Sequence, residues 1–127
     1  MNNYSIPEEN IFVREVERYF EELIIKYKYI VTDKHAEKYS ARVVYINETI
    51  HRKIEISNQT NYTDYGFSIF LYNTQNNEFN IIVNVPFDKQ DKECIFLKTA
   101  SEFLLNNQQD LVAGNRWEKY KQISMQK

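Results

Sequence analysis

The chain has 127 residues, enough for one domain that buries roughly two thirds of the surface exposed by its unfolded form. Its net charge of −2 and pI near 5.7 lack the basic excess of nucleic-acid-binding domains, so we expect no direct nucleic-acid partner. Aromatic residues make up 15% of the chain, and tyrosine at such density is typical both of small cores and of contact surfaces.

Cysteine usage and hydropathy indicate where the protein works. Cys94 is the single cysteine, which excludes an internal disulfide and favours a reducing compartment. No apolar run approaches the ~18 residues that a membrane span needs. Residues Met1–Pro7 also lack the basic and apolar regions of a secretion signal. We therefore expect a cytoplasmic protein that does not associate with membranes.

The first predicted element is an amphipathic helix. Ser5-Ile6-Pro7-Glu8 combines a capping serine, an early proline and an acid three residues on, which is typical of a helix start. Apolar residues then recur every three or four positions and form one stripe: Phe12, Val16, Tyr19, Phe20, Leu23, Ile24 and Tyr27. After this helix, Thr32–Lys38 is predicted to be a polar connection.

The middle of the chain is predicted to form a four-stranded antiparallel meander. Its strands are Ala41–Ile46, Ile50–Ser57, Gly66–Tyr72 and Glu78–Val85. Short polar links at residues 47–49 and 73–77 join the first pair and the last pair as hairpins, and consecutive strands with such links pair as neighbours.

The last two strands predict how the sheet faces the core. In the final strand the alternation places Phe79, Ile81, Val83 and Val85 on the core face and Asn80, Ile82 and Asn84 on the opposite face. In the strand before it, Phe67, Ile69 and Leu71 face the core. The opposite face of that strand is also apolar, because it carries Phe70 and Tyr72. The sequence thus predicts an apolar surface on the side of the sheet away from the core.

The C-terminal part is predicted to be helical. Asp88 or Asp91 can cap a helix that runs to about Ala113, and the polar run 106–109 could split it in two. Gly114 suits a left-handed C-terminal stop, and Trp117 is expected to cover the core. The predicted fold is therefore a single α+β domain over residues 1–127, with an N-terminal helix, the meander sheet, and C-terminal helices packed on one sheet face.

The residues that carry chemistry are few and scattered. Neither glycine belongs to a phosphate-binding motif, and neither His35 nor His51 has a metal-ligand partner at a suitable spacing. Cys94 lies at a core position of a predicted helix. Asp64 and Glu78 are spaced acids, but the acid-x-lysine pattern of a metal-dependent nuclease is absent after Glu78. We therefore expect no catalytic residues, metal or cofactor.

A contact surface is the better prediction. Tyr62, Asp64 and Tyr65 lie on the long polar link between the second and third strands, and exposed tyrosines beside an acid suit recognition. Together with Phe70 and Tyr72 they are the predicted partner-binding residues. The alternative is that these tyrosines lie back over the edge of the sheet.

The element order also resembles a known group of proteins. Tyr45-Ile46-Asn47 before the second strand, Leu104-Leu105, and Leu111–Trp117 near the end give the chain a layout similar to small bacterial immunity proteins. Those proteins are encoded beside polymorphic or contact-dependent toxins. The resemblance covers most of the chain in layout and includes no diagnostic motif. It implies that the protein binds one cognate toxin domain, such as a nuclease, and occludes its active site.

Four alternatives stay open at this stage. A phage-encoded inhibitor of a host defence nuclease would use the same kind of contact surface to bind a different partner. A secretion-type chaperone would hold an extended segment on its apolar sheet face. A small enzyme would need a deep pocket that gathers Asp64, Glu78 and either His35 or His51. The sheet face with Phe70, Tyr72 and Ile82 could instead be a homodimer contact.

Overall fold

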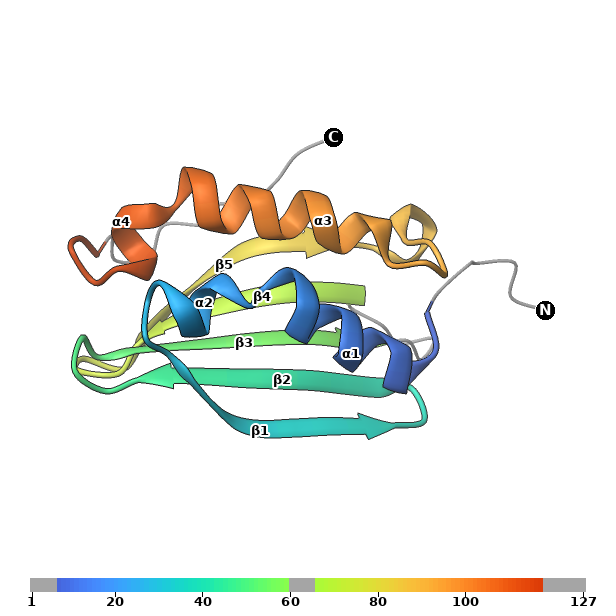
Figure 1. Cartoon of the computed structure of the whole chain (residues 1–127), viewed down its shortest axis with the longest axis horizontal. Coiled ribbons are helices and arrows are strands. Elements are labelled where there is room, and N and C mark those ends of the chain that lie inside the picture. The colour runs from blue at the N-terminus through green and yellow to red at the C-terminus, as the bar shows by residue number, and fades with distance from the viewer. Residues whose placement is uncertain (1–6, 60–65, 118–127) are drawn as a thin grey trace.

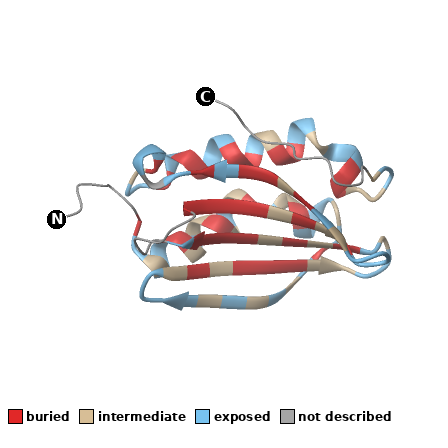
Figure 2. Ribbon diagram, turned by 180° about the vertical axis from the view of Figure 1, so that it is seen from behind, coloured by how far each residue is buried: buried red, intermediate tan, exposed pale blue. Residues whose placement is uncertain are grey.

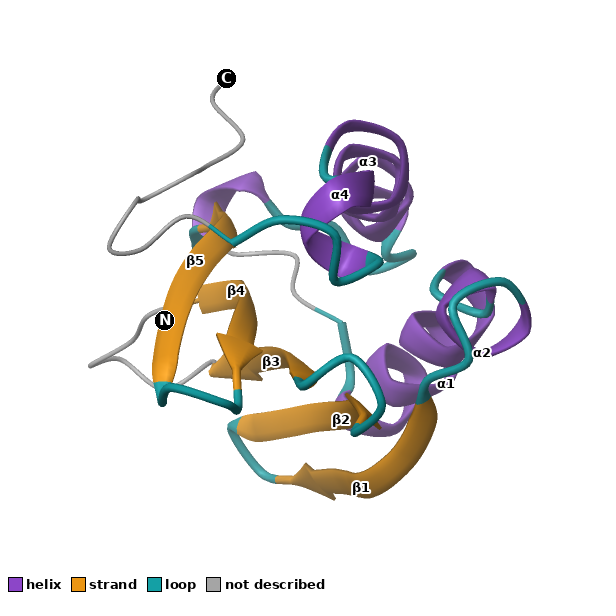
Figure 3. Cartoon of the chain, turned by 90° about the vertical axis from the view of Figure 1, so that its left-hand side faces the viewer, coloured by secondary structure: helices purple, strands orange, loops and turns teal. Residues whose placement is uncertain are grey.

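A computed structural model shows two layers, a five-stranded antiparallel sheet and a layer of helices on one of its faces (Figure 1). The structure describes residues 7–59 and 66–117. Seen along the sheet, the α-helices all lie on the same side of the strands, and the other side carries no described helix (Figure 3). The α+β class and the placement of the helices on one face are as predicted.

The elements follow one another in a simple order. The two N-terminal helices are α1 (Glu9–Tyr19) and α2 (Glu22–Ile25). The strands are β1 (Ile30–Glu37), β2 (Ser40–Asn47), β3 (Arg52–Gln59), β4 (Gly66–Asn73) and β5 (Glu78–Val85). A 3-10 turn η1 (Phe87–Lys89) leads to α3 (Ile95–Glu102), a π-helical turn η2 (Phe103–Asn107) and α4 (Gln109–Val112).

The meander has five strands, so the prediction of four was wrong by one. The spatial order is β1-β2-β3-β4-β5, and every neighbouring pair is antiparallel. The missed strand is β1, which was predicted to be a polar connection. It is an edge strand in which no residue is fully buried, so its sequence lacks the apolar alternation that reveals a strand with one face in the core.

The N-terminal helix begins slightly later than its predicted start. Glu8 is its N-cap, and the Glu8 carboxylate accepts hydrogen bonds from the backbone N–H groups of Asn10 and Ile11 at 3.0 and 3.2 Å. Ser5, the predicted cap, lies outside the described residues. Phe12 and Val16 point into the core from one side of α1, as the stripe predicted, and Ile24 is exposed on α2. Buried residues are concentrated in β2 to β5 and along the helices, whereas the edge strand β1 has none (Figure 2).

The region from residue 88 to 113 is not one continuous helix. Asp91 caps α3, because its two carboxylate oxygens accept the N–H groups of Ile95 and Phe96 at 2.8 and 3.0 Å. A π-helical turn then replaces the regular helix at the predicted polar interruption, and α4 follows as a separate turn. Gly114 ends the region with a φ of +80°, as its predicted role as a left-handed stop requires.

A β-bulge in β5 changes which side chains face the core. Ile69 pairs with Val83 and Phe70 pairs with Ile81, so Ile82 is the extra residue on β5. The side-chain alternation changes phase there, and the predicted facing is wrong for the first half of the strand. Phe79 and Ile81 lie on the outer face, while Asn80 and Ile82 are buried. Val83 and Val85 are buried, as predicted.

Two buried side chains fasten the C-terminal helices to the rest of the chain. The Arg52 guanidinium, 4% exposed on β3, donates to the backbone carbonyls of Leu111 and Arg116, each at 3.1 Å. The Tyr29 hydroxyl donates to the Val112 carbonyl at 2.7 Å. These carbonyls lie at or beyond the end of α4, where helix C=O groups have no partner within the helix. Trp117 stacks on Arg52 and packs against the core, as predicted.

Candidate protein-binding surface

The outer face of the sheet carries an aromatic cluster at its β4–β5 side. Phe70 and Tyr72 of β4 have ring centroids 6.3 Å apart. Phe79 of β5 lies 6.1 Å from the ring of Phe70 and 5.5 Å from that of Tyr72. Phe79 is 50% exposed, so the cluster reaches solvent. Ring separations of this size are typical of favourable aromatic contacts.

Strand register explains why these rings meet. Tyr72 is directly opposite Phe79, and Phe70 is opposite Ile81. Directly opposite residues of an antiparallel pair point to the same face, and their side chains touch. The bulge at Ile82 is what turns Phe79 and Ile81 to the outer face, because without it they would point into the core with Val83.

Two rows of five residues extend this surface across the sheet, and seven of these ten residues are apolar. Because each strand is in register with its neighbour, one residue of every strand falls in each row. We call these ten residues the outer patch. The first row is Ile30, Ile46, Lys53, Tyr72 and Phe79, and the second is Asp33, Val44, Glu55, Phe70 and Ile81.

Two opposite charges sit on the central strand of the outer patch. Lys53 and Glu55 of β3 are two residues apart and therefore share its outer face. The Lys53 ammonium lies 4.4 Å from the Tyr72 ring centroid, and the Tyr72 hydroxyl donates to the Glu55 carboxylate at 3.4 Å. Burial, together with the nearby Glu55 carboxylate, raises the pKa of Tyr72, so its hydroxyl keeps the proton that it donates.

The rest of the outer face is polar. In the next row, Arg42 donates to the Asp33 carboxylate at 2.8 Å, and Asn84 donates to the Ser68 hydroxyl at 3.0 Å. The outer face thus divides across its strands into an apolar part and a polar part. A partner placed on the outer patch would bury aromatic and aliphatic side chains at its centre and contact polar groups at one side.

Comparison with known proteins identifies no family for this chain. No family model, curated protein sequence or solved structure matches the chain. What the outer patch does is therefore inferred from its own residues.

The structure brings together part of the predicted binding site. Phe70 and Tyr72 lie in the outer patch, as predicted for the free sheet face, whereas Ile82 is buried in the core. Tyr62, Asp64 and Tyr65 lie outside the described residues. Sequence reasoning missed Phe79 and Ile81. The predicted 73–77 turn would pair Tyr72 with Glu78, whereas Asn73 pairs with Glu78 and so places Phe79 opposite Tyr72.

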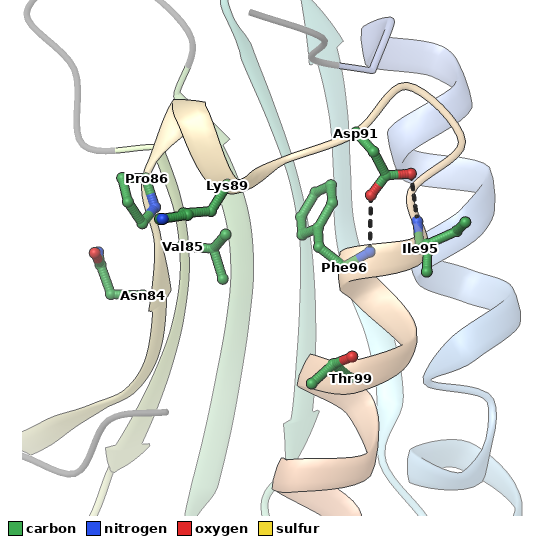
Figure 4. Close-up of a pocket in the computed structure, with 8 residues that line it drawn as sticks. All are labelled: Asn84, Val85, Pro86, Lys89, Asp91, Ile95, Phe96 and Thr99. Atoms are coloured by element: carbon green, nitrogen blue, oxygen red, sulfur yellow. Dashed lines mark hydrogen bonds between the residues drawn. The ribbon is translucent and has the colours of Figure 1, made fainter. Parts of the chain in front are cut away.

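A hollow lies between the end of β5 and the start of α3 (Figure 4). It holds about 230 Å³. Four apolar residues line it, Val85, Pro86, Ile95 and Phe96, together with four polar ones, Asn84, Lys89, Asp91 and Thr99. The carboxylate of Asp91, on its rim, already accepts two hydrogen bonds from α3. The hollow therefore has an apolar wall beside separate polar groups, and the one acid among its lining residues is already hydrogen-bonded to α3.

The groups considered for a small enzyme are described only in part, because Asp64 lies outside the described residues. His35 lies on β1 and Glu78 on β5, which are opposite edges of the sheet. Among the described residues, no three His, Cys, Asp or Glu side chains are placed to share a metal ion. Cys94 is buried, and burial raises the pKa of its thiol to about 12, which makes the thiolate form rare. Nor does the described part contain a helix long and apolar enough to cross a bilayer.

Proposed function

We propose that this chain is a cytoplasmic immunity protein that binds one bacterial toxin domain through the outer patch and neutralises it by covering its active site. In this proposal the chain acts by binding and not by catalysis. The observation that supports it most is the aromatic cluster of Phe70, Tyr72 and Phe79 on a sheet face with no described helix over it.

The chemistry of the outer patch suits a protein partner. Aromatic rings held by strands lose little conformational freedom on binding, and they supply most of the energy when they become desolvated at the centre of an interface. Lys53 and Glu55 lie among these rings and can pair with opposite charges of the partner. Such pairs contribute more to the choice of partner than to affinity.

Growth protection tests this proposal directly. The chain is produced in bacteria together with the product of a neighbouring gene that arrests growth when produced alone. The wild-type chain should restore growth. Phe79→Lys should lose protection, because it places a charge at the exposed centre of the aromatic cluster.

Ile95→Lys is the matched control, since Ile95 is 60% exposed on α3, on the helix side of the sheet. It should protect as well as the wild type, and both variants should keep the wild-type circular dichroism spectrum. Absence of protection by the wild type would overturn the proposed function. Equal protection by both variants would remove the outer patch from the interface.

A further inference from the structure

The two charges on the central strand of the outer patch form a self-complementary pattern. Lys53 and Glu55 occupy adjacent rows of the central strand, one positive and one negative. Within the described residues, neither side chain takes part in an ion pair. Apolar residues of both neighbouring strands flank them: Val44, Ile46, Phe70 and Tyr72. A surface that holds both members of an ion pair side by side can pair with a copy of itself.

We propose that a second copy of this chain packs face to face on the outer patch, with Lys53 of each copy against Glu55 of the other. The two-fold axis lies between the two sheets, runs across the strands, and passes between the two rows of the patch. Each strand then crosses its own symmetry mate in the antiparallel sense, at the angle of about −30° that twisted sheets adopt when they stack.

This axis also matches the apolar residues of β2, β4 and β5. It places the first row of one copy over the second row of the other, so Tyr72 meets Phe70 and Phe79 meets Ile81. Ile46 meets Val44 on the other side of the central strand, and at the β1 edge Ile30 meets Asp33. The alternative is a two-fold axis that also lies between the two sheets but runs parallel to the strands. It would place Lys53 on Lys53 and Glu55 on Glu55. Like charges in contact at an interface repel each other, which disfavours that arrangement.

The size of the overlap fits a weak, reversible pair. Each of the five strands has eight residues, but the axis lies near one end of the strands, so about five residues of each strand lie over the other copy. At roughly 3.3 Å per residue and 4.8 Å between strands, this overlap covers roughly 400 Å² on each copy. The pair buries about 800 Å² in total, which is the size of a weak, transient protein–protein interface.

The inference goes beyond the proposed function, since it holds whatever partner the outer patch binds. A second copy on the patch would have to leave before a toxin domain could bind there. The dimer would thus lower the apparent affinity for the partner and keep the aromatic cluster out of water when the partner is absent.

Charge reversal tests the dimer on the full-length chain. Sedimentation velocity at roughly 100 µM, where weak interfaces associate, should give the wild type twice the mass of its 15.4 kDa chain. Lys53→Glu and Glu55→Lys should each be monomeric, because each places two like pairs in the interface. An equimolar mixture of the two variants should form a heterodimer, because every pair is then opposite in charge. The double variant Lys53→Glu/Glu55→Lys should dimerise again.

Lys98→Glu, an exposed position on α3, is the control for a change of net charge and should stay dimeric. Circular dichroism should show every variant folded. A monomeric wild type would overturn the inference, and so would single reversals that still dimerise or a mixture that stays monomeric. A monomer that protects cells from the toxin would leave the proposed function intact, whereas a charge-dependent dimer without protection would overturn the proposed function alone.

Discussion

Two neighbouring positions of β5 have opposite environments although their side chains are similar. Val83 is fully buried between the sheet and the helices, whereas Ile81 is half-buried in the outer patch. Simple alternation would place both in the core, and only the bulge at Ile82 separates them. The two positions therefore give a direct test of the bulge.

Aspartate substitutions should separate the two positions. Val83→Asp buries a carboxylate without a partner and should cost about 4 kcal/mol or more, a large part of the stability of a domain of this size. Ile81→Asp keeps its carboxylate at the surface and should cost about 1 kcal/mol or less. Urea unfolding followed by circular dichroism measures both. Equal losses would mean that β5 has no bulge and that Ile81 also faces the core.

At the scale of whole elements, Arg52 joins the C-terminal helices to the sheet. Its guanidinium donates to four backbone carbonyls, those of Ile50, His51, Leu111 and Arg116, at 3.1 to 3.3 Å. Burial lowers the pKa of Arg52 from its ordinary value, yet that value is so high that the group stays charged. It is thus a buried cation whose described hydrogen bonds all go to carbonyl oxygens.

Arg52→Ala should loosen α4 and cost about 3 kcal/mol, because it removes the charged hydrogen bonds that hold the Leu111 and Arg116 carbonyls to β3. Trp117, the one tryptophan of the chain, stacks on Arg52 and reports the change by its fluorescence. Arg42→Ala on β2 is the comparison, since Arg42 makes a half-exposed ion pair with Asp33. That variant should cost about 1 kcal/mol or less. Similar losses for both variants would contradict the role given to Arg52.

The elements differ in how far the sequence could predict them. Apolar periodicity predicts strands β2 to β5 and the two helical regions, because each of these elements buries one face. β1 does not, since it lies at an edge and its strand identity depends on pairing with β2. β-sheet pairing is a tertiary contact, so no local pattern within residues 30–37 could reveal it.

The candidate site was predictable only in part, for a related reason. Phe70 and Tyr72 stand out because β4 is apolar on both faces. Phe79 and Ile81 join them through a bulge, and Lys53 and Glu55 become neighbours of Tyr72 through strand register. Bulge position and register are set by packing between strands. The pattern of a single strand therefore predicts that Phe79 and Ile81 face the core and that Lys53 and Glu55 face only solvent.

For the molecule as a whole, the two faces of the sheet have different uses. The helices fill one face and complete a core with buried titratable side chains, among them Tyr29, Tyr45 and Cys94. The apolar residues of the other face form the outer patch and lie outside that core. Because stability comes mainly from the covered face, substitutions in the outer patch can change binding with little effect on folding.

The buried titratable groups make the stability of the whole domain sensitive to high pH. Burial raises the pKa of the Cys94 thiol from about 9 to about 12, and it raises the pKa of the Tyr29 and Tyr45 hydroxyls above their ordinary value of 10. In the unfolded chain these groups lose their protons at the ordinary values. Above about pH 9 the unfolded state therefore binds fewer protons than the folded state, and the free energy of unfolding falls as the pH rises.

The thiol titrates first in the unfolded chain, so its share can be isolated. The free energy of unfolding should fall by about 1 kcal/mol between about pH 8 and pH 9.5, as measured by urea unfolding. Cys94→Ala should be less stable than the wild type at the lower pH, since it leaves a cavity, but its stability should change less over the same interval. Above about pH 10 both proteins should lose stability together as the tyrosines titrate in the unfolded chain. A wild-type stability that stays level to pH 9.5, or an unchanged slope in Cys94→Ala, would mean that the thiol is not protonated and buried in the folded state.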